Sequence, residues 1–228
     1  MKIEIWSDII CPFCYIGKRK LELALEQTGI KATIDWRSFE LNPAASQSYG
    51  MPLPDVMESL YGFGRSRALT ILATEEYEAK KVGLDFQWRK AKPGNTFNAH
   101  RLIHLAKHHD LGPAAKERFL RAYFTEGQDI GDPKVLRAAA LEVGLTAKDV
   151  DEVLSTNKYG DEVRGDEDLA RKLGIRGVPY FRINGSKTLS GARDVSDFVD
   201  ALVSEATPED TASSGGGTCE NGFCEIRR

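Results

Sequence analysis

The sequence lacks the features of a chain that crosses a membrane or binds nucleic acid. No apolar run approaches the roughly 20 residues that a membrane-spanning helix needs. Neither sign of charge is in clear excess, because 31 Lys and Arg residues stand against 34 Asp and Glu residues, for a formal net charge of −3. We therefore expect neither nucleic acid nor a membrane as a partner. A Gly-rich phosphate-binding loop is also missing, and we expect no bound cofactor.

Cysteine is scarce as well. The 228 residues contain 4, arranged as two close pairs, Cys11 with Cys14 and Cys219 with Cys224. A disulfide scaffold would be shorter and richer in cysteine, and a chain of this length buries a sizeable core without crosslinks. The first residues show no basic and then apolar leader, which favours a cytoplasmic protein; a processed secreted protein given a new start Met would look the same. In the cytoplasm, close cysteine pairs indicate redox chemistry or metal binding.

The order of predicted elements indicates an α/β fold interrupted by helices. A strand at 2–7, a helix from Pro12 to about residue 27 and a strand at 31–39 form a βαβ unit. Later predicted elements are helices at 55–62, 65–82, 96–109, 113–126, 133–143, 147–155 and 158–173, strands at 177–183 and 187–190, and a helix at 194–205. Two sheet-forming halves are thus separated by a helical insertion of about 120 residues.

The pair Cys11 and Cys14 begins the first helix. Cys11 lies at its N-terminus, where unpaired N–H groups and the helix dipole favour a thiolate. We predict that Cys11 is the exposed attacking thiol with a lowered pKa and that Cys14 is the resolving thiol. Pro12 and Phe13 between them offer no side-chain donor to the thiolate, which predicts a more reducing couple than a His there would give.

A second motif, Gly177-Val178-Pro179, opens a strand. A proline leading a central strand is unusual unless it has a specific role. Beside the Cys-x-x-Cys turn we predict a cis Val178–Pro179 bond, which presents the Val178 backbone to a visiting chain. The alternative is a trans proline at a strand start.

Three segments together resemble one family. They are Trp-Ser-Asp-Ile-Ile-Cys-Pro-Phe-Cys-Tyr-Ile-Gly-Lys at 6–18, Asn-Thr-Phe-Asn-Ala-His-Arg-Leu at 95–102 and Gly-Val-Pro-Tyr-Phe at 177–181. Each looks like the DsbA-like branch of the thioredoxin superfamily, and within it the FrnE-type subfamily. Periplasmic DsbA-type oxidants have a His in the dipeptide and a leader segment. This chain has neither, so a strong-oxidant role is not expected.

The resemblance implies an α/β, thioredoxin-like fold with a large inserted α-helical domain. Its thioredoxin-like part would comprise 1–40 and 161–206, and the insertion 41–160. The resemblance also assigns Cys11 and Cys14 as the redox pair and Pro179 as the cis-proline. Substrates would be protein or low-molecular-weight thiols and disulfides, with a recycling reductant. Val178, Pro179, Pro12 and Phe13 are the candidate substrate-binding residues.

The last residues have a different composition. Residues 207–218 are rich in Gly, Ser and Thr and predict a flexible linker. Beyond it, Cys219 and Cys224 flank a turn sequence and could exchange with Cys11, as a relay pair on a tether. Two alternatives stay open: an inert terminal disulfide, and a zinc site made of both pairs. Zinc would silence Cys11, so we expect no metal.

Other polar residues give weaker signals. His100, His104 and His108 recur every four residues, so they share a helix face, which we interpret as a surface or interface stripe rather than a ligand set. Asn98 and His100 belong to the family-like motif and are candidates for the cleft facing Cys11. Asp8 could move protons for Cys11, although a capping or surface group is the commoner case. The acidic pair Glu75 and Glu76 is expected to be solvated.

These signals favour a cytosolic thiol–disulfide oxidoreductase, a disulfide reductase or isomerase that uses Cys11 and Cys14 through a mixed disulfide. One alternative is a glutathione-dependent isomerase or transferase. Such relatives carry Ser where Cys11 stands and lack the second Cys. The presence of both cysteines therefore argues against this alternative. The other alternative is a redox-sensing binding module whose tail changes state.

Overall fold

The computed structural model describes residues 1–62 and 64–211 and contains one mixed sheet with the order β2-β1-β3-β4. β1 (Lys2–Ser7) runs parallel to β2 (Thr33–Ser38) and antiparallel to β3 (Tyr180–Ile183). β3 pairs antiparallel with β4 (Lys187–Ser190) through the predicted turn at Asn184 and Gly185. Both residues have positive φ, 47° and 76°, as the central residues of a type I′ turn require.

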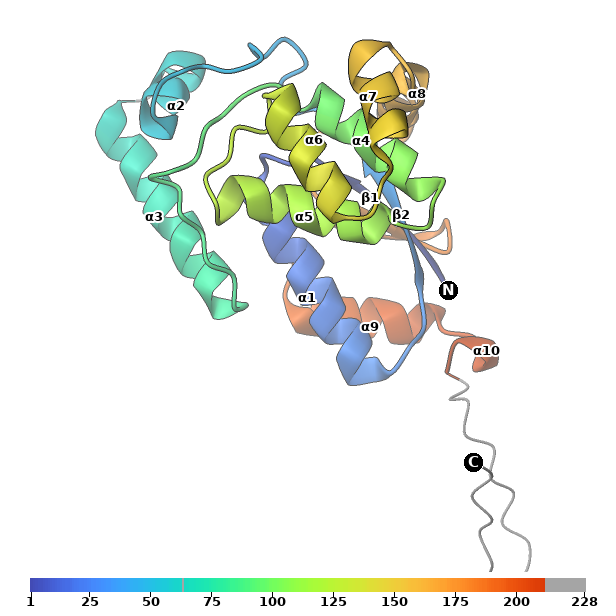
Figure 1. Cartoon of the computed structure of the whole chain (residues 1–228). Coiled ribbons are helices and arrows are strands. Elements are labelled where there is room, and N and C mark those ends of the chain that lie inside the picture. The colour runs from blue at the N-terminus through green and yellow to red at the C-terminus, as the bar shows by residue number, and fades with distance from the viewer. Residues whose placement is uncertain (63, 212–228) are drawn as a thin grey trace, which may run out of the picture.

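Two helices pack together against one face of the sheet. α1 (Pro12–Thr28) starts at Pro12, where the missing N–H costs nothing, and ends at Gly29 with φ 66°. α9 (Val195–Glu205) starts with a capping box at Asp194. Figure 1 shows α1 and α9 side by side at the lower end of the domain. Ile3 and Ile5 of β1 are buried in the core beneath them.

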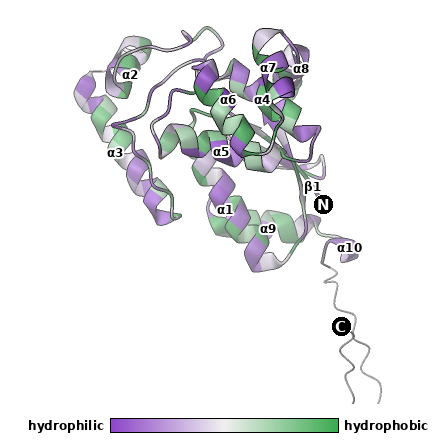
Figure 2. Ribbon diagram, viewed as in Figure 1, coloured by the Kyte–Doolittle hydropathy of each residue, from purple (hydrophilic) through white to green (hydrophobic). Residues whose placement is uncertain are grey.

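The predicted helices between β2 and β3 are confirmed within a few residues at each end. They are α2 (Leu53–Tyr61), α3 (Arg65–Lys81), α4 (Phe97–Lys107), α5 (Gly112–Phe124), α6 (Pro133–Glu142), α7 (Ala147–Ser155) and α8 (Gly160–Lys172). In Figure 1, α2 and α3 stand to one side of α4 to α8. Figure 2 shows hydrophilic segments along much of α3, whose buried residues are Ala68, Leu72 and Ala79. Within the described ranges, no helix is long and apolar enough to cross a membrane.

The flexible linker predicted for residues 207–218 starts too early, because the chain still has regular structure after residue 207. Residues 208–211 form a short helix, α10 (Pro208–Thr211). The Asp210 carboxylate pairs with the amino group of Met1 and accepts a hydrogen bond from the Thr207 backbone N–H. Thr207 to Thr211 are therefore attached beside the start of β1, and the flexible-linker prediction is wrong for these residues.

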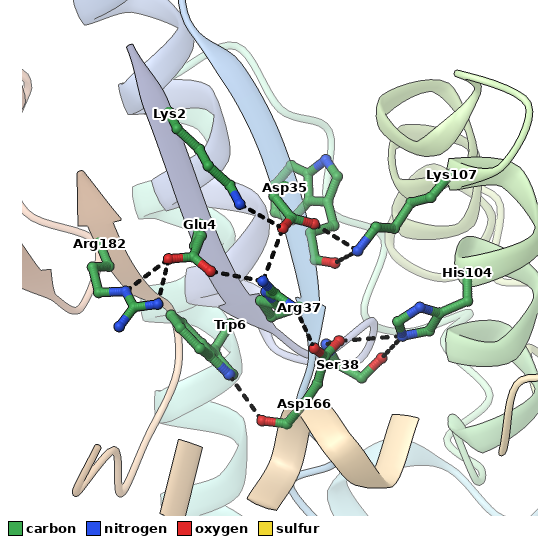
Figure 3. Close-up of polar contacts among 11 residues, drawn as sticks. Lys2, Glu4, Trp6, Asp35, Arg37, Ser38, His104, Lys107, Asp166 and Arg182 are labelled. Atoms are coloured by element: carbon green, nitrogen blue, oxygen red, sulfur yellow. Dashed lines mark hydrogen bonds and ion pairs between the residues drawn. The ribbon is translucent and has the colours of Figure 1, made fainter. Parts of the chain in front are cut away.

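The other face of the sheet is polar (Figure 3). The Glu4 carboxylate on β1 lies between two cations and accepts hydrogen bonds of 2.7 Å from both Arg37 on β2 and Arg182 on β3. Asp166 of α8 accepts from Arg37 at 2.9 Å and lies 3.2 Å from Nε2 of His104 on α4. Asp166 thus attaches α8 to β2 through Arg37 and contacts α4 through His104. Its buried charge is stable only with such partners.

Candidate active site

Cys11 takes the position that the sequence predicts. It follows the end of β1 and is the N-cap of α1, with extended backbone angles (φ −85°, ψ 114°). Its carbonyl accepts a hydrogen bond of 3.1 Å from the Cys14 N–H. Cys11 and Cys14 are both free thiols. Cys11 is less exposed than predicted, with 4% of its surface accessible, but Cys14 is more deeply buried at 1%.

Val178 and Pro179 lie against the redox pair. The Val178–Pro179 bond is cis, as predicted, and the Cys11 thiol donates to the Val178 carbonyl at 3.6 Å. Gly17 of α1 makes this close packing possible, since a Cβ there would lie 3.2 Å from Cγ of Pro179 and 3.1 Å from Cζ of Phe181. A glycine inside a helix lowers helix propensity, and this signal could have identified Gly17 from the sequence.

The electrostatics of the pair differ from the prediction. The pKa of Cys11 is raised well above its ordinary value by the neighbouring Cys14 sulfur, by burial and by the negative charge of Asp8. Burial also raises the pKa of Cys14. However, the Cys11 thiol, the charge of Lys116, the Ser7 hydroxyl and the Asp8 backbone N–H outweigh burial, so the Cys14 pKa is lowered. The cation and the hydrogen-bond donors thus gather at Cys14 rather than at Cys11.

Lys116 of α5 is a site residue that sequence reasoning missed. It is 1% exposed, and its Nζ donates to the Ser7 carbonyl at 3.3 Å. Burial lowers its pKa to about 8, against the opposing effects of Cys14, Asp8 and Cys11. The available signal was helical spacing, since Lys116 lies three and four residues before Phe119 and Leu120, on the buried face of α5.

Asp8 is fully buried, so the interpretation as a surface group is wrong. One carboxylate oxygen accepts from the Ile9 N–H at 2.7 Å and lies 3.2 Å from Nε2 of His100, while the other accepts from the Leu41 N–H at 2.7 Å. Burial lowers the pKa of His100 more than Asp8 raises it, so the imidazole is neutral. Burial would raise the pKa of Asp8, but His100 and Leu41 hold it below its ordinary value.

The histidine-stripe prediction is wrong for two of its three members. His100 and His104 are 1% and 7% exposed and face Asp8 and Asp166, respectively. His108 is exposed and stacks on Tyr159 at 5.3 Å. The reason is that α4 is the central helix of the insertion, buried on every side from Ala99 to Ala106. These histidines position the turn and the sheet rather than form a surface.

The remaining candidate site residues lie in different parts of the chain. Asn98 accepts a 2.7 Å hydrogen bond from Arg101, and no contact joins it to Cys11. Pro12 is half-buried and Phe13 is 42% exposed, so both remain accessible to an incoming chain. Cys219 and Cys224 lie outside the described residues. Within residues 1–62 and 64–211, no cluster of His, Cys, Asp and Glu could hold a metal ion.

Comparisons with known proteins show the family of the chain. The sequence matches the family described as DSBA-like thioredoxin domain over residues 2–203. The uncharacterized protein YwbO of Bacillus subtilis is 30% identical over 205 residues, which are 89% of this chain and 96% of YwbO. A probable DsbA oxidoreductase of Streptomyces coelicolor has a TM-score of 0.84 and 33% identity, with 100% of both chains covered.

A more distant structure has the same fold. DsbM of Pseudomonas aeruginosa, described as a cytosolic disulfide reductase, has a TM-score of 0.62 at 17% identity, covering 90% of this chain and 98% of its own. A second structure of DsbM is described as a complex with GSH.

Proposed function

The chain belongs to the DSBA-like thioredoxin domain family, and we propose that it is a cytoplasmic thiol–disulfide oxidoreductase that reduces or isomerises disulfides through Cys11 and Cys14. The observation that carries the proposal is the position of the two free thiols at the start of α1, with the Cys11 sulfur 3.6 Å from the Val178 carbonyl. The test is acceleration of insulin reduction by dithiothreitol, followed as turbidity. No acceleration would contradict the proposal.

The reaction has two exchange steps. The Cys11 sulfur bonds to one sulfur of the substrate disulfide, and the other substrate sulfur leaves as a thiolate and takes up a proton. The Cys14 thiolate then attacks the Cys11 sulfur, which releases the second substrate thiol and forms the Cys11–Cys14 disulfide. In isomerisation the freed substrate thiolate attacks another disulfide of the substrate instead. The thiolate released there attacks the substrate sulfur bonded to Cys11, which forms the new substrate disulfide and returns Cys11 to the thiol.

When the pair carries one thiolate, the two sulfurs share one proton, and Cys14 is placed to accept it as Cys11 attacks. Cys14 passes this proton to the leaving substrate thiolate, so that it is again a thiolate for the second step. The Val178 carbonyl accepts from Cys11, and Val178, Pro179, Pro12 and Phe13 would hold the substrate chain. A thiol reductant must supply the two electrons and two protons that return the pair to the dithiol. Glutathione is the first to test, because DsbM is described in complex with GSH.

Replacing Lys116 with methionine is expected to raise the first pKa of the dithiol by about one unit, because the cation that stabilises the shared thiolate is lost. Thiolate absorbance at 240 nm reports this in a background where Cys219 and Cys224 are serine. Lys148→Met, at an exposed position, is the matched control. An unchanged titration would show that Lys116 does not stabilise the thiolate.

We also propose that Cys219 and Cys224 exchange with Cys11 and Cys14, on the sequence argument of a tethered second dithiol. α10 leaves only eight residues from Thr211 to Cys219, at most about 28 Å of chain, and it lies beside Met1, at the end of β1 away from Cys11. The chain that would carry Cys219 from α10 toward Cys11 is therefore short. Deleting residues 212–228 is expected to change turnover with a recycling reductant. Unchanged turnover would show that Cys219 and Cys224 take no part in the reaction.

A further inference from the structure

An apolar pocket lies beside the redox pair and encloses about 920 Å³, counting the part that opens to solvent. It lies between α2, α3, the end of α5 and the loops that follow β2 and α3. Ile10 and Pro12, which flank Cys11 on either side, form part of its wall. A chain bound to the Cys11 sulfur would therefore lie next to the wall of this pocket.

The walls are mostly hydrocarbon and aromatic. Val56 and Leu72 are buried at the wall from α2 and α3, as is Phe86 from the loop after α3. Leu41 and Leu60, both 44% exposed, also line the pocket and leave apolar surface accessible. Apolar surface in a concave site next to a reactive group is typical of a ligand pocket.

One carboxyl interrupts this apolar lining. Glu75 of α3 is neither fully buried nor exposed, and it lines the pocket, contrary to the solvated position expected for it. Among the described residues it has no hydrogen bond or ion pair, whereas its neighbour Glu76 pairs with Trp88 and Arg89. Burial alone raises the pKa of Glu75 to about 7, and no neighbour offsets this.

An unpaired carboxylate in an apolar wall is costly, so the group takes up a proton more readily, and a cation that joins it would stabilise the charged form. Lys and Arg side chains match both features of the lining, since their long hydrocarbon stems bury well on apolar surface and their tips are charged. An anionic ligand would face the Glu75 charge without a compensating cation. The apolar lining and the Glu75 carboxyl thus favour the same occupant.

We propose that this pocket binds a Lys or Arg side chain of a disulfide-bonded peptide whose cysteine docks at Cys11. The inference rests on the proposed function and names its substrate class: protein disulfides with a basic residue near the reacting cysteine. Glu75 acts here as a binding and specificity residue and takes no part in sulfur exchange.

The test is equilibrium binding, by calorimetry, of short peptides with a central S-methylcysteine that cannot exchange. Each peptide carries Lys at one of the three positions on either side, and norleucine peptides of the same length serve as uncharged controls. At one position, Lys is expected to bind about tenfold more tightly than norleucine. Glu75→Gln should reduce that preference to within about twofold, while Glu78→Gln, on the same helix outside the pocket, should retain it.

Equal binding of all peptides, or a Lys preference that persists in Glu75→Gln, would overturn the proposal. Melting curves show whether the Glu75→Gln variant is folded, which we expect because it removes an unpaired charge and keeps the shape. Since these peptides cannot exchange sulfur, the binding result is independent of activity. Failure of the wild type to reduce insulin would refute the proposed function instead.

Discussion

Replacing Cys11 with serine is expected to lower the catalysed reduction of a disulfide substrate by at least about 1,000-fold, to the uncatalysed rate. A hydroxyl oxygen cannot form the mixed disulfide on which both exchange steps depend. Cys14→Ser should differ in kind, because its first step remains possible. It should react once with substrate and then turn over slowly, since without Cys14 the mixed disulfide waits for another thiol, such as dithiothreitol, to resolve it.

Insulin reduction measures both variants, and thermal melting shows whether they are folded. The two phenotypes separate an oxidoreductase from a binding module, which would lose no turnover in either variant. A Cys11→Ser protein that still accelerates insulin reduction would refute the role of Cys11 as the attacking sulfur.

Replacing Asp8 with alanine is expected to cost about 3–5 kcal/mol of unfolding free energy at neutral pH, the range for breaking a buried, hydrogen-bonded charge network. The Ile9 and Leu41 N–H groups would lose their acceptor, and His100 would lose its partner. Urea unfolding measures the loss. Asp200→Ala, at an exposed position on α9, is the control and should change stability by less than about 0.5 kcal/mol.

The stability that Asp8 contributes should also depend on pH. The folded-state pKa of Asp8 is lowered, so its contribution is present above the unfolded value of about 3.9 and disappears as the pH falls through the lower folded pKa. His100 acts in the same direction. Its folded pKa is lowered, so the unfolded chain takes up a proton first below about pH 6.5. A wild-type protein as stable at pH 4 as at pH 7 would contradict this account.

The helix ends and turns that were predicted correctly are marked by residue types within the same short segment. Pro12 and Gly29 mark the two ends of α1, and Asn184-Gly185 marks the β3–β4 turn. The redox motif and Pro179 were also visible, because their chemistry depends on residue type and spacing. Such features need no knowledge of distant partners.

The features that sequence reasoning missed depend on distant residues. The lowered pKa of Cys14 depends on the Cys11 thiol and on Lys116, which lies in α5, more than 100 positions along the chain. The burial of His100 and His104 depends on how α4 packs against the sheet and its neighbours. Periodicity shows which residues share a helix face, but it does not show whether that face is turned to solvent.

The central claim is that Cys11 exchanges with substrate and Cys14 resolves the product. It is tested most directly by incubating Cys14→Ser protein with a peptide disulfide and mapping the covalent adduct by mass spectrometry. We predict one peptide bound per protein through Cys11, released by dithiothreitol. An adduct found only on Cys219 or Cys224, or none on Cys11, would contradict the account.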